Sequence, residues 1–139
     1  MPFLLRSLIV LMPVFLAGAA AAQVPPGCSG ASDQASLNEC ADKAYKKTDA
    51  ALNATYNEII GRLKNDKETR HRLVAAQQAW IGFRDAECDF ATGGSRQGSI
   101  YPMLVQNCRN ELTHDRLEQL KGYLKCEEGD LSCPVPPAK

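Results

Sequence analysis

The feature that most constrains this chain is the spacing of its apolar residues, which recur in steps of three and four. They do so over three stretches, at about residues 33–64, 73–88 and 100–124. This spacing places apolar side chains on one face of a helix, whereas a half-buried strand needs strict alternation. Ser32 or Asp33 can cap the first helix. The sequence therefore predicts an all-α domain of three helices.

Two polar breaks indicate how these helices connect. Residues 65–67 form a short break, so the first two helices should make a long antiparallel hairpin. The glycine- and serine-rich residues 92–99 end the second helix. Pro102 fits the first turn of the third helix, where its missing N–H does no harm. We expect a small three-helix domain stapled by disulfides.

The N-terminus has the layout of a signal peptide. Arg6 supplies a positive charge, residues 8–16 form an apolar run, and small residues follow up to Ala22. The run is too short for a transmembrane helix. We expect residues 1–22 to be removed and residues 23–31 to form an extended leader. The mature protein should be periplasmic or secreted, without a stable membrane anchor.

The six cysteines all follow that segment, which favours disulfides over metal ligands. No Cys-x-x-Cys occurs, so we expect no metal site. Six cysteines allow many pairings, and the sequence does not choose among them. The simplest assignment joins neighbours along the chain: Cys28–Cys40, Cys88–Cys108 and Cys126–Cys133. The last pair would close a tail at residues 126–139, which follows the helical domain at residues 32–125.

Charge and side-chain chemistry argue against nucleic-acid binding and catalysis. The 16 basic residues equal the 16 acidic ones, whereas a protein that binds a phosphate backbone carries a basic excess. His71 and His114 lie in polar helical contexts, with no activated nucleophile beside them. Asp85, Glu87 and Asp89 do not share one helix face, so they indicate a charged surface and not a glycosidase pair. We expect no enzyme activity, no cofactor and no nucleic-acid partner.

A stripe on the second helix is the first candidate functional feature. Gln77, Trp80 and Arg84 recur at helical spacing, and Trp80 and Arg84 can stack. The simpler interpretation is structural: Trp80 anchors the core while Arg84 pairs with an acid of the first helix, such as Asp49.

The glycine loop is the second candidate feature. It carries Ser95, Arg96 and Ser99 between Cys88 and Cys108. A rigid polar loop can plug a cleft, because its conformational entropy is already lost on folding. The segment can equally be a plain connector.

Several of these residues together resemble the lysozyme inhibitor LprI-like family. The resemblance covers about residues 28–124, and its most specific part is Gln-x-x-Trp-x-x-Phe-Arg-Asp-x-x-Cys, from Gln77 to Cys88. Its other residues are Cys40, Asp49, Leu52, Asn53, Tyr56, Gly98, Ser99, Cys108, Leu112 and Arg116. It implies a small helical bacterial domain of the cell envelope that inhibits lysozyme, with Asp49, Tyr56, Gln77, Trp80 and Arg84 as its structural motif. The Cys126/Cys133 tail and the absence of a lipid-anchor cysteine depart from it.

The resemblance leads to a hypothesis about binding. A lysozyme cleft works with two carboxylates, so Arg96 can approach them as a cation while Ser95 and Ser99 donate hydrogen bonds. The carboxylates at positions 85, 87 and 89 can steer a basic enzyme towards this loop. The alternative is a non-inhibitory module of the cell envelope that binds another protein or peptidoglycan through a helix face.

Overall fold

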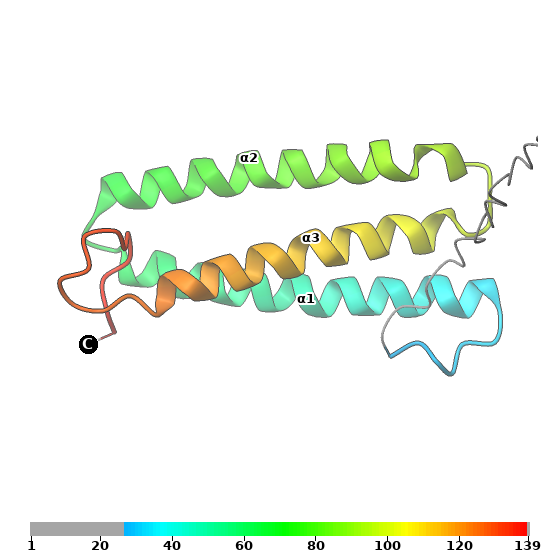
Figure 1. Cartoon of the computed structure of the whole chain (residues 1–139), viewed down its shortest axis with the longest axis horizontal. Coiled ribbons are helices and arrows are strands. Elements are labelled where there is room, and N and C mark those ends of the chain that lie inside the picture. Colours follow the sequence, from blue (N-terminus) through cyan, green and yellow to red (C-terminus); the bar gives the residue numbers. More distant parts are fainter. Residues whose placement is uncertain (1–26, 139) are drawn as a thin grey trace, which may run out of the picture.

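The structure is a computed structural model that describes residues 27–138. It contains three α-helices, α1 (Gln34–Arg62), α2 (Lys67–Thr92) and α3 (Tyr101–Leu124), and a short 3-10 turn, η1 (Gly93–Ser95). They run up, down and up as an elongated bundle (Figure 1). The described part of the chain has no strand, which confirms the predicted all-α class. The expected signal peptide, residues 1–22, lies outside the described residues.

Local hydrogen bonds explain where the first two helices begin. Asp33 caps α1, since its Oδ1 accepts from the Ser36 N–H at 2.7 Å and the Ser36 hydroxyl oxygen accepts from the Asp33 N–H at 3.2 Å. Asp66 caps α2 by accepting from the Thr69 N–H at 2.9 Å. Each cap satisfies a helix N–H group that has no partner within the helix. Pro102 lies in the first turn of α3.

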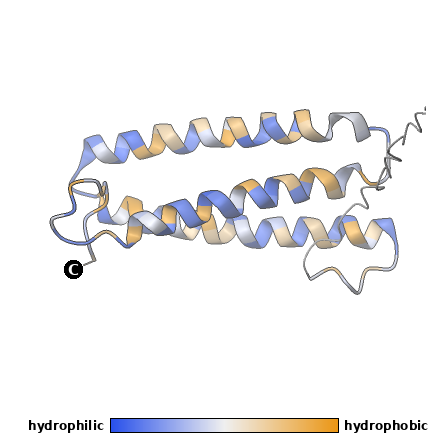
Figure 2. Cartoon of the chain, in the orientation of Figure 1, coloured by the Kyte–Doolittle hydropathy of each residue, from blue (hydrophilic) through white to orange (hydrophobic). Residues whose placement is uncertain are grey.

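The core lies mainly between α1 and α3, which run in the same direction side by side (Figure 1). Leu52 and Ile59 of α1, and Leu63 directly after it, are buried against Leu117 and Leu120 of α3. The predicted hairpin of α1 and α2 is present, but α2 stands further from α1 than α3 does. Polar and apolar residues are interspersed along each helix (Figure 2).

Three disulfides hold the ends of the helices. Cys28–Cys40 ties the leader to α1, Cys88–Cys108 joins α2 to α3, and Cys126–Cys133 closes the tail. Their Cα–Cα distances are 5.8, 5.7 and 5.6 Å, within the usual range for a disulfide. No cysteine of the described chain is free.

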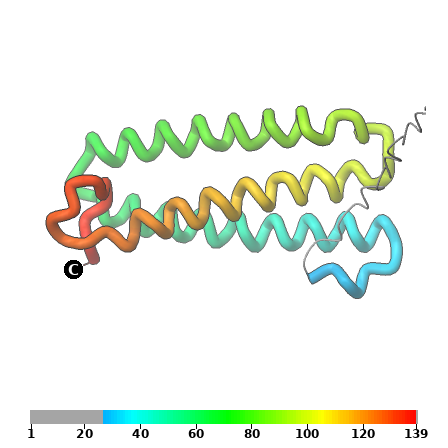
Figure 3. The backbone as a smooth tube through the Cα atoms, in the orientation of Figure 1, coloured from blue at the N-terminus to red at the C-terminus, as the bar shows by residue number. Residues whose placement is uncertain are grey.

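The tail after α3 is part of the core. It folds back over the end of the bundle opposite the 93–99 loop (Figure 3). Val135 is only 3% exposed and joins the cluster that contains Ile59 and Leu63. Among residues 27–138, none of the helices is both long and apolar enough to cross a membrane.

Candidate functional site

The motif residues of α2 meet in the space between α2 and the other two helices. Arg84 is nine-tenths buried, and its Nε donates to the Asp85 carboxylate at 3.0 Å. Its Nη1 lies 3.7 Å from the Asp49 carboxylate of α1. The guanidinium also lies over the rings of Trp80 and Tyr45, at 5.1 and 5.6 Å from their centroids. This is the arrangement that the structural interpretation of the stripe predicts.

The surroundings of Arg84 also affect Tyr45. Burial raises the pKa of the Tyr45 phenol, and the positive charge of Arg84 opposes that rise. Arg109 of α3 reaches the same Asp85 carboxylate at 3.5 Å. The cluster therefore joins all three helices through charged groups.

A second buried polar contact lies about two turns away, towards the other end of α2. Gln77 is buried, and its Oε1 accepts from Nε of Arg116 on α3 at 3.0 Å. Tyr56 packs against the apolar core near this level. Of the five motif residues, Gln77 and Arg84 are buried, and Asp49, Tyr56 and Trp80 are partly buried. Their geometry supports a structural role.

The 93–99 loop is held from several sides at the opposite end. The Gly98 N–H donates to the Ser95 carbonyl at 2.9 Å, and the Asn38 side chain of α1 donates to the Ser99 carbonyl at 3.0 Å. The Cys88–Cys108 disulfide closes the base of this turn. The side chains of Arg96 and Ser99 are exposed, whereas Ser95 is half-buried.

The charges beside the loop are largely engaged. Arg96 pairs with Asp89, and both side chains are more than half exposed. The Asp85 carboxylate already pairs with Arg84 and Arg109. Of the three carboxylates expected to steer a basic enzyme, Glu87 has no ion-pair partner among the described residues. Electrostatic steering by this end of the molecule is therefore weaker than the sequence suggests.

Comparison with known proteins identifies the family. The sequence model described as "Lysozyme inhibitor LprI" matches residues 27–120, which is most of the described chain. The chain belongs to the LprI lysozyme inhibitor family. The match includes all three helices except the last turn of α3, and both disulfides that precede the tail.

Two curated relatives are similar to this LprI family member. "Uncharacterized protein R02472" of Rhizobium meliloti (strain 1021) is 40% identical over 123 residues, which cover 81% of this chain and 88% of the relative. "Uncharacterized protein YecT" of Escherichia coli (strain K12) is 27% identical over 105 residues, covering 66% of this chain and 65% of the relative. Neither name states an activity. No solved structure matches the chain.

The LprI family is one of lysozyme inhibitors and not of enzymes. A lysozyme is therefore the kind of partner that the family implies. The family and the three disulfides are consistent with an extracytoplasmic protein. The described residues hold no cluster of three or more His, Cys, Asp or Glu side chains suited to a metal ion.

Sequence reasoning missed Arg109 of α3 altogether, and it included Arg116 only among the residues that resemble the family, without its contact to Gln77. Arg109 and Arg116 complete the polar layer between α2 and α3, but neither was assigned a role from spacing alone. The available signal was their position: Arg109 follows Cys108 directly, and Arg116 lies beside the apolar Leu117. A charged residue at such a position is often assigned to the surface, because Arg is rarely fully buried.

Proposed function

We propose that this protein is an exported lysozyme inhibitor, released into the periplasm or the medium after removal of residues 1–22, and that its 93–99 loop enters the cleft of the enzyme. The observation that carries the proposal is the way the loop is fixed. It is polar and exposed at its tip, yet Cys88–Cys108 and the Asn38–Ser99 hydrogen bond hold its base. A loop ordered in advance loses little entropy on binding.

Arg96 supplies the charge for this mode of inhibition. Its pair with Asp89 lies on the surface, where such pairs contribute about 1 kcal/mol or less. Little stability is therefore lost when Arg96 leaves Asp89 for a carboxylate of the enzyme, and a charged hydrogen bond formed in a water-poor cleft offsets part of the cost of desolvating the two charges. Ser99 presents a free face to the same partner, since Asn38 uses its carbonyl oxygen and not its side chain.

Titration of lysozyme activity with the purified protein tests the function. We expect lysis to fall at micromolar protein, and we expect Ser95→Ala/Arg96→Ala to weaken inhibition by about tenfold or more. Lys121→Ala is the matched control. It removes a cation of similar exposure, paired with Glu118, from the other end of α3. Its inhibition constant should be unchanged.

Two negative results have different meanings. If the wild-type protein leaves several lysozymes unaffected at micromolar concentration, the inhibitory function is wrong. If the wild type inhibits and the folded double variant inhibits equally well, the function stands and the loop is not the binding element.

A second candidate is a non-inhibitory envelope module that binds through α2. It is favoured by two exposed aromatic side chains, Phe83 at 55% and Phe90 at 83%, which lie two turns apart on the same side of the helix. Sedimentation with purified peptidoglycan separates the candidates. This second function requires binding that Phe83→Ala/Phe90→Ala removes, together with unaffected lysozyme.

A further inference from the structure

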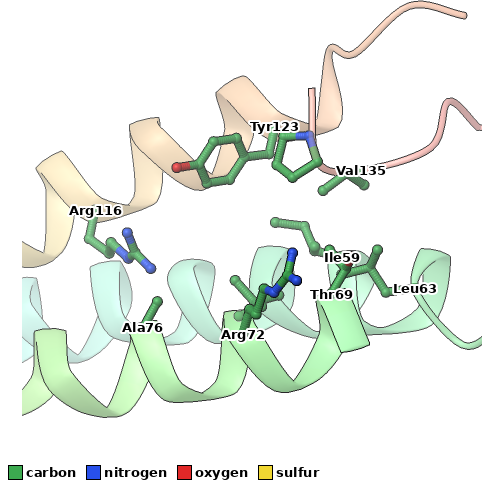
Figure 4. Close-up of a pocket in the computed structure, with 10 residues that line it drawn as sticks. Ile59, Leu63, Thr69, Arg72, Ala76, Arg116, Tyr123 and Val135 are labelled. Atoms are coloured by element: carbon green, nitrogen blue, oxygen red, sulfur yellow. The ribbon is translucent and has the colours of Figure 1, made fainter. Parts of the chain in front are cut away.

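A pocket of about 350 Å³ opens at the end of the bundle opposite the 93–99 loop (Figure 4). Its apolar wall comes from Ile59 of α1 and Leu63 directly after it, Leu73 of α2 and Val135 of the tail. Figure 4 shows Arg116 of α3 projecting into the space between the helices at one side of this wall. The pocket thus combines an apolar surface with a cation.

Arg116 is a buried cation for which the described chain provides no counterion. It is 9% exposed, and its two hydrogen bonds go to neutral amides, from Nε to Gln77 at 3.0 Å and from Nη1 to Gln119 at 2.5 Å. None of the ion pairs among residues 27–138 includes Arg116, and its Nη2 makes no hydrogen bond there but is not among the fully buried atoms that lack a partner. Burial lowers the pKa of Arg116, but a guanidinium remains charged at neutral pH.

Arg84 has the carboxylate partners that Arg116 lacks. Both arginines are equally buried in the space between α2 and its neighbours, but Arg84 has Asp85 at 3.0 Å and Asp49 at 3.7 Å. A buried charge without an opposite charge is costly, so an anion beside Arg116 would be favoured. The open Nη2 and the adjoining pocket leave space for that anion.

We propose that this pocket binds a small amphiphilic carboxylate, with its head on Arg116 and its apolar chain against Ile59, Leu63 and Val135. A guanidinium presents its N–H groups in the geometry that a carboxylate accepts. Arg72 supplies a second cation at the rim, where it pairs with Glu68 on the surface. A volume of 350 Å³ holds roughly a dozen water-sized groups, which corresponds to a carboxylate of about eight to ten carbons.

The tail contributes one side of this pocket. Pro134 and Val135 form one side of the pocket, and Cys126–Cys133 fixes the turn that places them there. These residues follow the segment matched by the LprI family, which ends at residue 120. The site therefore depends in part on a segment beyond the matched family region, although Arg116 and the helix residues of the wall lie within it.

Calorimetric titration of the purified protein with octanoate tests the proposal. We expect saturable binding, with affinity rising about fourfold per added CH₂ until the pocket is full. Acetate, which lacks the chain, and octanol, which lacks the charge, should bind at least tenfold more weakly. Arg116→Met should lower octanoate affinity about tenfold or more, and Arg116→Lys should retain part of it.

A second variant keeps the test valid if Arg116→Met does not fold. Ala76 of α2 lines the pocket, so Ala76→Phe should fill it and abolish octanoate binding. Ala79 is exposed one turn away on the same helix and does not line the pocket, so Ala79→Phe is the matched control. The proposal is overturned by absence of wild-type binding at millimolar octanoate, by equal binding of octanol, or by unchanged affinity in Ala76→Phe. None of these results bears on lysozyme.

Discussion

Replacement of Arg84 by methionine tests the structural interpretation of the charged cluster inside the bundle. Methionine keeps most of the length and the apolar contacts of the arginine side chain. The variant loses the bond to Asp85 at 3.0 Å, the pair with Asp49 at 3.7 Å, and the contacts with the rings of Trp80 and Tyr45. The cost of these losses can be worked out from their surroundings.

The two carboxylates are only partly buried. The side chains of Asp49 and Asp85 are 35% and 44% exposed, so water solvates them once Arg84 is gone. The charged interactions with these carboxylates therefore contribute to stability at the low end of the usual range, about 1.5 kcal/mol. The contacts with Trp80 and Tyr45 add about 0.5–1 kcal/mol each. We expect Arg84→Met to lower the free energy of unfolding by about 3 kcal/mol, less than the loss for a fully buried pair.

Urea unfolding followed by circular dichroism measures this change. Arg72→Met is the matched control, because Arg72 is on the same helix but makes only an exposed pair with Glu68; its cost should stay within about 0.5 kcal/mol. A second readout is the pKa of Tyr45, which should rise because the charge of Arg84 holds it down. Equal stability losses in the two variants, or an unchanged Tyr45 pKa, would refute the reasoning.

Three further expectations follow from the same geometry. Cys88→Ser/Cys108→Ser opens a loop with a sequence separation of 20, so urea unfolding should show a loss of about 3 kcal/mol; a loss near zero would contradict it. Hydrogen bonds from the Ser36 backbone and side chain lower the pKa of Asp33, so its contribution to stability is complete above about pH 4 and is lost as pH falls through that lowered pKa. Asp33→Asn should therefore lose less stability than the wild type in acid unfolding below about pH 4, and parallel curves would count against this. Native-state hydrogen exchange should be slower for amides at 84–88, near the disulfide and the Arg84 cluster, than for those at 70–74, and the reverse gradient would show that the pocket end of α2 is the more stable one.

The helices could be predicted from the sequence because the signal for them is local. Apolar steps of three and four, the Asp33 cap and the glycine-rich break at 92–99 each act over a few residues. The Asp49–Arg84 contact could also be anticipated, since a charge on the inner face of a helix needs a partner on another. The pairing of neighbouring cysteines is the choice that closes the shortest loops.

The tail and the pocket could not be derived in this way. Nothing in the order Cys126 to Pro137 indicates that Val135 packs against the C-terminal end of α1, because that contact depends on where three helices end in space. Periodicity shows which face of a helix is turned inwards, but not how far away its neighbour lies. The distance between α2 and the other two helices therefore could not be predicted from the sequence.

That spacing is the physical reason for the polar interior. Because α2 stands away from α1 and α3, the long side chains of Arg84, Gln77 and Arg116 bridge much of the distance, while Leu73 and Trp80 of α2 reach the apolar core. Two of these three side chains, Arg84 and Arg116, carry a positive charge. At one end of α2, carboxylates of the chain neutralise that charge; at the other end, the charge of Arg116 meets only amides. A cation without a carboxylate partner beside an apolar pocket therefore fits the way this bundle is packed, and it is the feature on which the proposed carboxylate site rests.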